Sequence, residues 1–327
     1  MSEHLEWDLA FQELVKKANR ALALLNHRAR MCGGLHTNTY TMLFNQLVQP
    51  IILCNACISG HTVSRSILGI QYSAMRYLLG VGKVCPIAGL FGETGWVPLA
   101  MAIKFQIFRF NNRIRKMEGE RVTKKIHAWS KFISGKPTAK NWAGKTKELM
   151  ESIKDFSGLM TGDEQWDALA NLESKKWKET VDEIPVDSET GGRFRYYREI
   201  KVTPSSEQYI MRSASLNKRR IVAQLRCGCL PLEVETGRYR SPKTPLMERT
   251  CQLCKDGVGD ESHFLLSCHE LSSPRTELTQ AITDIVPNFS SLSAKEKTCQ
   301  ILLACATSPK VGTAICHLYR ERFNRLR

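Results

Sequence analysis

The segment from residue 251 to residue 268 has the sequence CQLCKDGVGDESHFLLSC, in which four potential metal ligands are spaced as Cys251-x2-Cys254-x8-His263-x4-Cys268. Zinc binds four nitrogen or sulfur ligands in a tetrahedron, and a Cys-x2-Cys turn presents two thiolates from neighbouring backbone. We expect Asp260 to cap a short helix whose last turn loosens, so that His263 and Cys268 face one point. Four protein ligands leave no open coordination position, so this pattern predicts one structural Zn²⁺.

The other cysteines give weaker signals. The chain has 12 cysteines and its first ten residues are charged and polar, so we expect reduced thiols or metal ligands rather than disulfides. His269 is an alternative fourth ligand. The pairs Cys54/Cys57 and Cys227/Cys229 are expected to lie in apolar surroundings rather than to bind metal. Three further thiols in helical patterns are expected in the core: Cys299, Cys305 and Cys316.

Basic residues dominate two long blocks of the chain. The net charge of the whole chain is +15; the net charge is +10 within residues 104–150 and +8 within residues 193–250. A polyanion is the partner that such charge favours, because each Lys or Arg placed on a phosphate releases condensed counterions. No apolar run reaches the roughly 18 residues that span a bilayer, so no membrane partner is expected.

The hydrophobic pattern predicts a mainly α fold. Apolar residues make up 43% of the chain and recur at helical spacing, which predicts a packed core. We expect a helical bundle over 1–118, a basic helical region with an acidic linker over 119–192, a basic region with the CCHC zinc module over 193–272, and short helices over 273–327. Helices are expected at 3–30, from 37 or 38 to 48, at 61–79, from 97, and from 205 or 206 to 226, with a structured turn over 85–98.

Several stretches carry a resemblance to a known family. They are Leu230-x-Leu232-Glu233-Val234-Glu235-Thr236-Gly237-Arg238-Tyr239, Arg249-Thr250-Cys251, Asp260-Glu261-Ser262-His263-Phe264-Leu265-Leu266-x-Cys268, Leu43-Phe44-x-x-Leu47-Val48-x-Pro50-Ile51-Ile52-Leu53, Leu79-Gly80-Val81 and Gly92-Glu93-Thr94-Gly95. Together they resemble the C-terminal part of LINE-type (non-LTR) retrotransposon reverse transcriptases: the thumb that follows the polymerase palm, and the zinc-knuckle tail. Residues 120–190 match that family only in being helical and basic.

This resemblance implies a retrotransposon origin and a role in binding RNA or DNA, as a single strand or a template–primer duplex. The polymerase palm of that family holds two metal ions on paired aspartates, and this chain contains no Asp-Asp pair. We therefore expect a truncated reverse transcriptase without polymerase activity on this chain alone. Two alternatives stay open: an accessory part that completes a polymerase together with a catalytic chain, and a zinc-stabilised protein–protein adaptor.

The basic block around the zinc motif supplies the predicted nucleic-acid contacts. Arg219 and Arg226 are seven residues apart on a predicted helix and so share a face. Tyr239 lies between two arginines and offers a ring on which an unpaired base could stack. The predicted contact residues are Arg219, Arg220, Arg226, Arg238, Tyr239, Arg240, Lys243 and Arg249.

A nuclease is the weakest of the functions considered. Asp187 followed by Glu199-Ile200-Lys201 loosely matches the acidic pattern of two-metal nucleases, but the pieces are short and common. The sequence shows no Gly-rich phosphate loop and no His-Glu-x-x-His motif.

Overall fold

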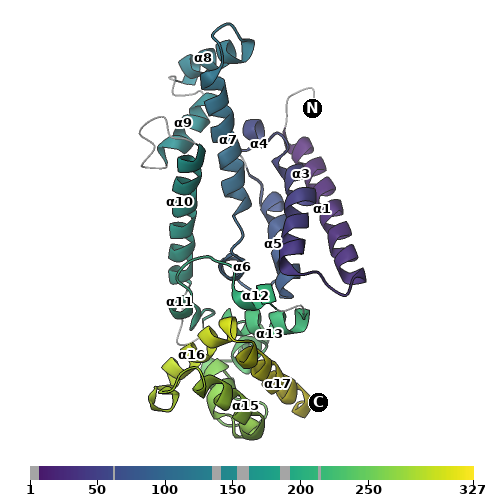
Figure 1. Cartoon of the computed structure of the whole chain (residues 1–327), viewed down its shortest axis with the longest axis vertical. Helices are drawn as coiled ribbons and strands as arrows, with labels where there is room; N and C mark the ends of the chain where they lie inside the picture. The colour runs from purple at the N-terminus through teal and green to yellow at the C-terminus, as the bar shows by residue number, and fades with distance from the viewer. Residues whose placement is uncertain (1–6, 62, 135–140, 153–161, 185–191, 213–214) are drawn as a thin grey trace. The chain divides into compact units, whose positions relative to one another are not determined.

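A computed structural model describes residues 7–61, 63–134, 141–152, 162–184, 192–212 and 215–327 (Figure 1). These residues are mainly helical, and the only β-structure among them is an isolated antiparallel bridge between Thr250 and Val258. The predicted mainly α fold class is therefore confirmed.

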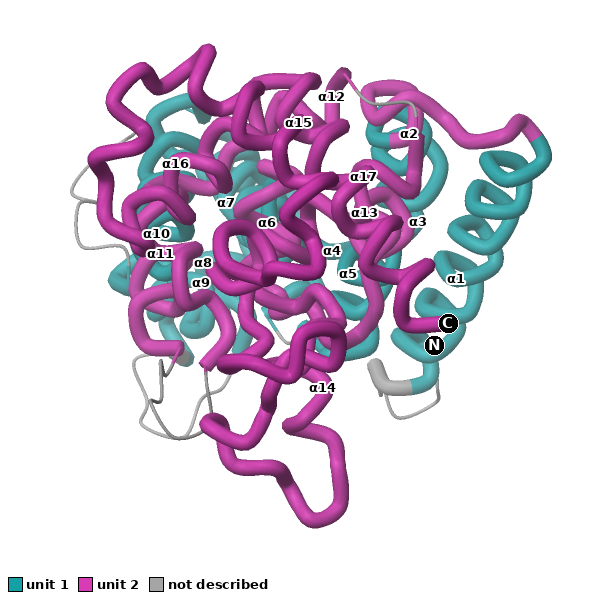
Figure 2. Tube along the Cα trace, turned by 90° about the horizontal axis from the view of Figure 1, so that it is seen from below, with its two compact units in different colours: residues 1–31, 41–74, 97–176 teal, residues 32–40, 75–96, 177–327 magenta. Residues whose placement is uncertain are grey.

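The chain divides into two compact units that interleave along the sequence (Figure 2). Unit 1 consists of residues 1–31, 41–74 and 97–176, and unit 2 of residues 32–40, 75–96 and 177–327. The four segments expected from the sequence were consecutive, whereas each of these units is assembled from three separate stretches.

The N-terminal helices follow the sequence signals closely. Helix α1 ends at Met31, just before Gly33 and Gly34, whose φ angles are +73° and +112°. The chain stays helical through Pro50 because this proline lies in the first turn of the next helix, where its missing N–H costs nothing. The bounds here are α1 Trp7–Met31, α2 Thr37–Leu43, the π-helix η1 Phe44–Val48, α3 Gln49–Leu53, α4 Ala56–Ser59 and α5 Arg65–Leu79.

Helices α7, Leu99–Lys116, and α10, Gly162–Glu183, run antiparallel in unit 1 (Figure 1). The direction follows from their polar contacts: Lys104 pairs with Glu173 at 2.8 Å, whereas Asn112 donates to Gln165 at 3.0 Å. Apolar residues fill the space between the two helices, including Met101, Phe108 and Leu169. Two further helices complete this part of unit 1: α8 Val122–Ser134 and α9 Trp142–Glu151.

The expected turn over residues 85–98 is wrong, because it contains a helix, α6 Ile87–Thr94. Pro86 precedes its first residue and Gly95, at φ +64°, ends it, so both are helix boundaries rather than breakers. Gly92, one of two glycines inside α6, has a packing role. A Cβ at Gly92 would lie 2.2 Å from the hydroxyl oxygen of Tyr197, a residue far along the chain.

The remaining helices belong to unit 2. The helix expected from residue 205 or 206 to 226 is two helices, and Ser215 caps the second by accepting from the backbone N–H of Lys218. The acidic linker was predicted over Val181–Gly192; residues 181–183 are still helical, as the end of α10, and residues 185–191 lie outside the described residues. The bounds are α11 Tyr197–Ile200, α12 Gln208–Arg212, α13 Leu216–Arg226, α14 Glu233–Thr236, α15 Ser272–Thr283, α16 Ala294–Thr307 and α17 Pro309–Arg325.

The C-terminal helices form a large part of the core of unit 2. Cys299, Cys305 and Cys316 are buried there, as predicted. Within the described residues, no single helix is long and apolar enough to cross a membrane; only α16 and α17 taken together, bent by 114°, have that length and composition.

Candidate metal centre and its surroundings

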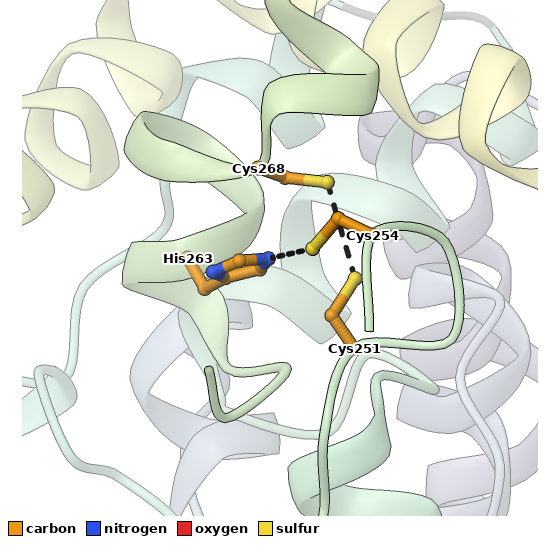
Figure 3. Close-up of side chains that lie close together, drawn as sticks. All are labelled: Cys251, Cys254, His263 and Cys268. Atoms are coloured by element: carbon orange, nitrogen blue, oxygen red, sulfur yellow. Dashed lines mark hydrogen bonds between the residues drawn. The ribbon is translucent and has the colours of Figure 1, made fainter. Parts of the chain in front are cut away.

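The four predicted ligands lie together in unit 2 (Figure 3). The sulfur atoms of Cys251, Cys254 and Cys268 and a ring nitrogen of His263 are all within 4.8 Å of one another. The Cys251 and Cys268 sulfurs are 3.9 Å apart. A tetrahedral zinc with Zn–S bonds of about 2.3 Å requires a sulfur–sulfur distance of about 3.8 Å. The cluster therefore can hold a metal ion with little rearrangement.

A tight turn positions the first two ligands. The backbone N–H of Lys255 donates to the carbonyl of Cys251 at 2.9 Å, and Lys255 itself has a φ of +59°. Gly257, at φ +63°, then reverses the chain, so that the N–H of Cys251 donates to its carbonyl at 3.0 Å.

A short π-helical turn, His263–Ser267, positions the other two ligands. Asp260 caps it as predicted, because its Oδ1 accepts from the N–H of His263 at 2.7 Å. The wider turn lets the N–H of Cys268 donate to the carbonyl of His263 at 2.9 Å, five residues back. The Ser267 hydroxyl is 3.4 Å from Nδ1 of His263, while Nε2 points to the Cys254 sulfur at 3.2 Å (Figure 3). Nε2 is therefore the donor atom toward a metal.

Burial favours the uncharged form of two of the ligands, Cys268 and His263, in the absence of a cation. Burial raises the pKa of Cys268 to about 12, and the neighbouring Cys251 and Cys254 add to the shift. Burial also lowers the pKa of His263, partly opposed by Asp260. Thiols in this state hold their protons, and a bound metal cation would replace those protons, since thiolates are the metal-binding form.

Residues far along the chain form a second layer around the ligands. Nη1 of Arg322, on α17, lies 4.0 Å from the sulfur of Cys251, and its Nη2 pairs with Glu233 at 2.5 Å. Glu233 also accepts from the backbone N–H of Gln252 at 2.9 Å, inside the cysteine turn. Arg275 donates to the carbonyl of Cys268 at 2.6 Å. Two arginines beside three sulfurs offset the negative charge that three thiolates would bring. The sequence alone does not reveal these two arginines, because only the fold brings them near the ligands.

The acidic residues of the stretches that carry the resemblance have structural partners. Glu93 is 0% exposed and lies 3.0 Å from Arg226. Glu261 pairs with Arg195 at 2.5 Å, and its side chain is 1% exposed. Burying such charges is costly unless they are paired. These acids therefore support the packing of unit 2 rather than binding a catalytic metal.

Three of the predicted nucleic-acid contacts are buried instead, which corrects the sequence-based assignment. Arg219 and Arg226 do share a face of α13, but it faces the core: they are 3% and 2% exposed. Arg219 donates to the hydroxyl of Thr37 at 3.1 Å. Arg249 is 4% exposed and donates to the carbonyls of Thr244 and Val234. The arginine content alone did not separate these core residues from surface ones.

The other five predicted contacts reach the surface to different extents. Arg238 is half-buried and lies 3.0 Å from Glu235, whose carboxylate also accepts from the Tyr239 hydroxyl at 3.0 Å. The ring of Tyr239 is nevertheless exposed. Three cations of the predicted set are exposed: Arg220, Arg240 and Lys243.

The remaining candidates do not join the metal cluster. His269 is exposed and lies 3.4 Å from Glu270. Cys227 and Cys229 are buried, as expected, whereas Cys54 is exposed, so its expected place in the core is wrong. Asp187 lies outside the described residues. The other parts of the nuclease-like pattern are engaged elsewhere: Glu199 pairs with Lys295, and Lys201 with Glu207.

No family model, no curated protein and no solved structure matches the chain.

Proposed function

We propose that the chain is a zinc-containing nucleic-acid-binding protein, derived from a LINE-type reverse transcriptase and without polymerase activity of its own. The observation that carries the metal half of this proposal is the convergence of three sulfurs and one imidazole nitrogen within 4.8 Å. Three soft sulfur donors and one imidazole suit Zn²⁺, whereas Mg²⁺ and Ca²⁺ prefer oxygen donors. Four ligands in a mostly buried cluster are typical of a structural site.

Zinc content tests this half directly. We expect one zinc per chain in the purified protein and none in a Cys254→Ser variant, because three ligands hold zinc far more weakly. Structural zinc contributes on the order of 10 kcal/mol or more to local folding, so hydrogen exchange should rise across residues 245–272 of that variant. Cys32→Ser removes an exposed thiol outside the cluster and serves as the control. One equivalent of zinc in a variant lacking both Cys251 and Cys268 would refute the assignment.

The charge of the chain supports the nucleic-acid half. The net charge is +15, and Arg220, Arg240 and Lys243 of the predicted contact residues are exposed. The exposed ring of Tyr239 precedes Arg240 and offers a surface for a base. Phosphate contacts release counterions, so RNA or DNA binding by such residues must weaken steeply as salt is raised.

Salt-dependent binding of a fluorescent RNA or DNA oligonucleotide tests this half. In an Arg240→Ala/Lys243→Ala variant we expect the slope of log K against log salt to fall by up to about two, with zinc retained. Arg238 should contribute less than these two residues, because Glu235 already neutralises it. A wild-type protein that binds neither RNA nor DNA would instead favour the protein–protein adaptor. Template-directed primer extension by the purified chain would contradict the absence of polymerase activity.

A further inference from the structure

Helix α8 of unit 1 turns large apolar side chains to solvent. Val122 is 70% exposed, Ile126 59%, Trp129 66% and Phe132 78%. Residues three or four apart lie on the same side of a helix, so these side chains form one continuous apolar face. His127, on the other side, is 7% exposed. A surface helix ordinarily buries its apolar face, so the exposed apolar face of α8 indicates a binding surface.

A basic cleft lies next to this face. It has a volume of about 560 Å³ and lies along the second half of α7 and the turn that leads into α8. Arg109, Arg113 and Lys116 line it at intervals of four and three residues, and Arg121 adds a fourth cation. None of the four forms an ion pair with another described residue, and Glu118 is the one acid among the described residues of the lining. Like charges at this spacing repel one another, and a bound anion would relieve that repulsion.

The cleft and the apolar face are continuous. Arg121 lines the cleft and immediately precedes the first residue of α8, which lies beyond the end of α7 (Figure 1). Lys125 follows one turn later, on the side of α8 that carries Trp129 and Phe132. Its partner is Glu120, whose side chain is 93% exposed, so this ion pair holds the lysine only weakly. The cations of the cleft and the aromatic rings of α8 therefore follow one another along one surface.

The charges decide which occupant fits this surface. A second copy of the chain would bring the same cations face to face. An uncharged apolar partner would cover the rings and leave the cleft cations without counter-charges. A single-stranded nucleic acid satisfies both parts, because its phosphates can lie in the cleft while its unpaired bases stack on the aromatic rings. A duplex offers the phosphates but keeps its bases stacked inside.

We infer that the α7–α8 surface binds single-stranded nucleic acid, with the backbone in the cleft of Arg109, Arg113, Lys116 and Arg121 and bases on Trp129 and Phe132. This inference rests on the proposed nucleic-acid function and assigns it a second surface, in unit 1. Helix α8 lies in the part of the chain that matches reverse transcriptases only in being helical and basic. The surface is therefore argued from its own side chains.

Binding of a 20-nucleotide single strand and of a duplex of equal length by the full zinc-loaded chain tests the inference. We expect Trp129→Ala/Phe132→Ala to weaken single-strand binding about tenfold or more, with little change for the duplex. Trp129→Phe alone should restore most of the affinity relative to Trp129→Ala, because a phenyl ring can still stack. Phe323→Ala, another exposed aromatic residue on α17, is the control. Because these side chains are exposed, the variants should fold as the wild type does.

Charge variants separate the cleft from a general effect of net charge. Arg113→Ala/Lys116→Ala should lower the salt slope by up to about two, whereas Arg28→Ala/Arg30→Ala on α1 removes the same charge and should leave it unchanged. Wild-type affinity and salt slope in both α7–α8 variants would overturn the inference while the proposed function stands. Loss of nucleic-acid binding by the wild type itself would overturn both. If Trp129→Ala/Phe132→Ala weakens binding to the single strand and to the duplex equally, the stacking role of the rings is wrong. The stacking role is also wrong if this variant loses affinity for phosphatidylserine vesicles and keeps wild-type affinity for the single strand.

Discussion

Replacing Arg226 by methionine tests whether this arginine belongs to the core rather than to a nucleic-acid surface. Its Nε lies 3.0 Å from one carboxylate oxygen of Glu93 and 3.2 Å from the other, and its Nη2 is 2.8 Å from Glu207. Its Nη1 donates to the carbonyl of Leu302 at 2.5 Å. Burial opposes the charged form, yet Glu93 and Glu207 hold the pKa of Arg226 well above its usual value. The arginine is therefore charged and fully paired.

The cost of the change follows from what it leaves behind. In Arg226→Met, the carboxylate of Glu93 would stay buried without the arginine. It would still accept a hydrogen bond from the Tyr209 hydroxyl, at 2.7 Å. Glu207 still pairs with Lys201 at 2.6 Å, so it is not stranded. Removing one partner of a buried ion pair costs about 3–5 kcal/mol. Changing Glu93 to methionine as well removes the stranded charge, so the double variant should recover part of that loss.

Urea unfolding, with hydrogen exchange of α13 peptides to follow unit 2, measures these free energies. Arg220→Met is the matched control, since Arg220 is exposed on the same helix; we expect a change within about 0.5 kcal/mol. RNA binding should show the opposite order of the two variants. Arg220→Met should lower the slope of log K against log salt by about one, whereas Arg226→Met should affect that slope less. If Arg226→Met keeps wild-type stability but weakens RNA binding, the core assignment of Arg226 is wrong.

Two further changes test the packing of each unit. Gly92→Ala should destabilise unit 2 by about 1–3 kcal/mol, because the new Cβ would lie 2.2 Å from the Tyr197 hydroxyl. Gly82→Ala is the control: a Cβ there has no atom within 4 Å, so the thermal unfolding temperature should not change. Equal shifts of the unfolding temperature in the two variants would contradict this reasoning. Burial, and next Lys131, lower the pKa of His127 in the folded state, so the unfolded state takes up the proton first as pH falls. The neutral form of His127 should therefore stabilise unit 1 above about pH 6.5, and this contribution should be lost as the pH falls below about 6.5. His127→Phe should reduce this loss in hydrogen exchange of α8 at pH 7.5 and 5; an unaltered pH dependence would exclude His127 as its source.

The metal site was predictable because all four ligands lie within 18 residues, and local turns alone bring them together. A Cys-x2-Cys turn, an Asp cap and a widened helical turn each act over a few residues. The same sequence could not show Arg322, because the contact with Glu233 joins residues 89 apart in the chain. Ligands encoded in one short segment are thus visible in the sequence, while the layer that orients them is not.

The nucleic-acid contacts were only partly predictable for a related reason. Burial of Arg226 depends on Glu93, 133 residues away, and nothing in the local pattern of α13 distinguishes it from the exposed Arg220. The helical period of α8 is clear in the sequence, but the direction in which its apolar face points depends on what α7 and α9 leave uncovered. Glycines and prolines around α6 suggested a turn, because close packing against Tyr197 cannot be distinguished from chain breaking without the fold.

The contact between Arg322 and the cysteine loop decides how the metal module can be produced and studied. A peptide that covers residues 245–272 would contain every ligand, yet it would lack both Glu233 and the C-terminal helix that carries Arg322. Such a peptide should bind zinc more weakly than the intact chain and without a defined shape. A stop codon between positions 269 and 322 should likewise weaken metal retention, even though it removes none of the four ligands. We therefore expect the module not to fold as an independent finger, and affinity tags are better placed at the N-terminus.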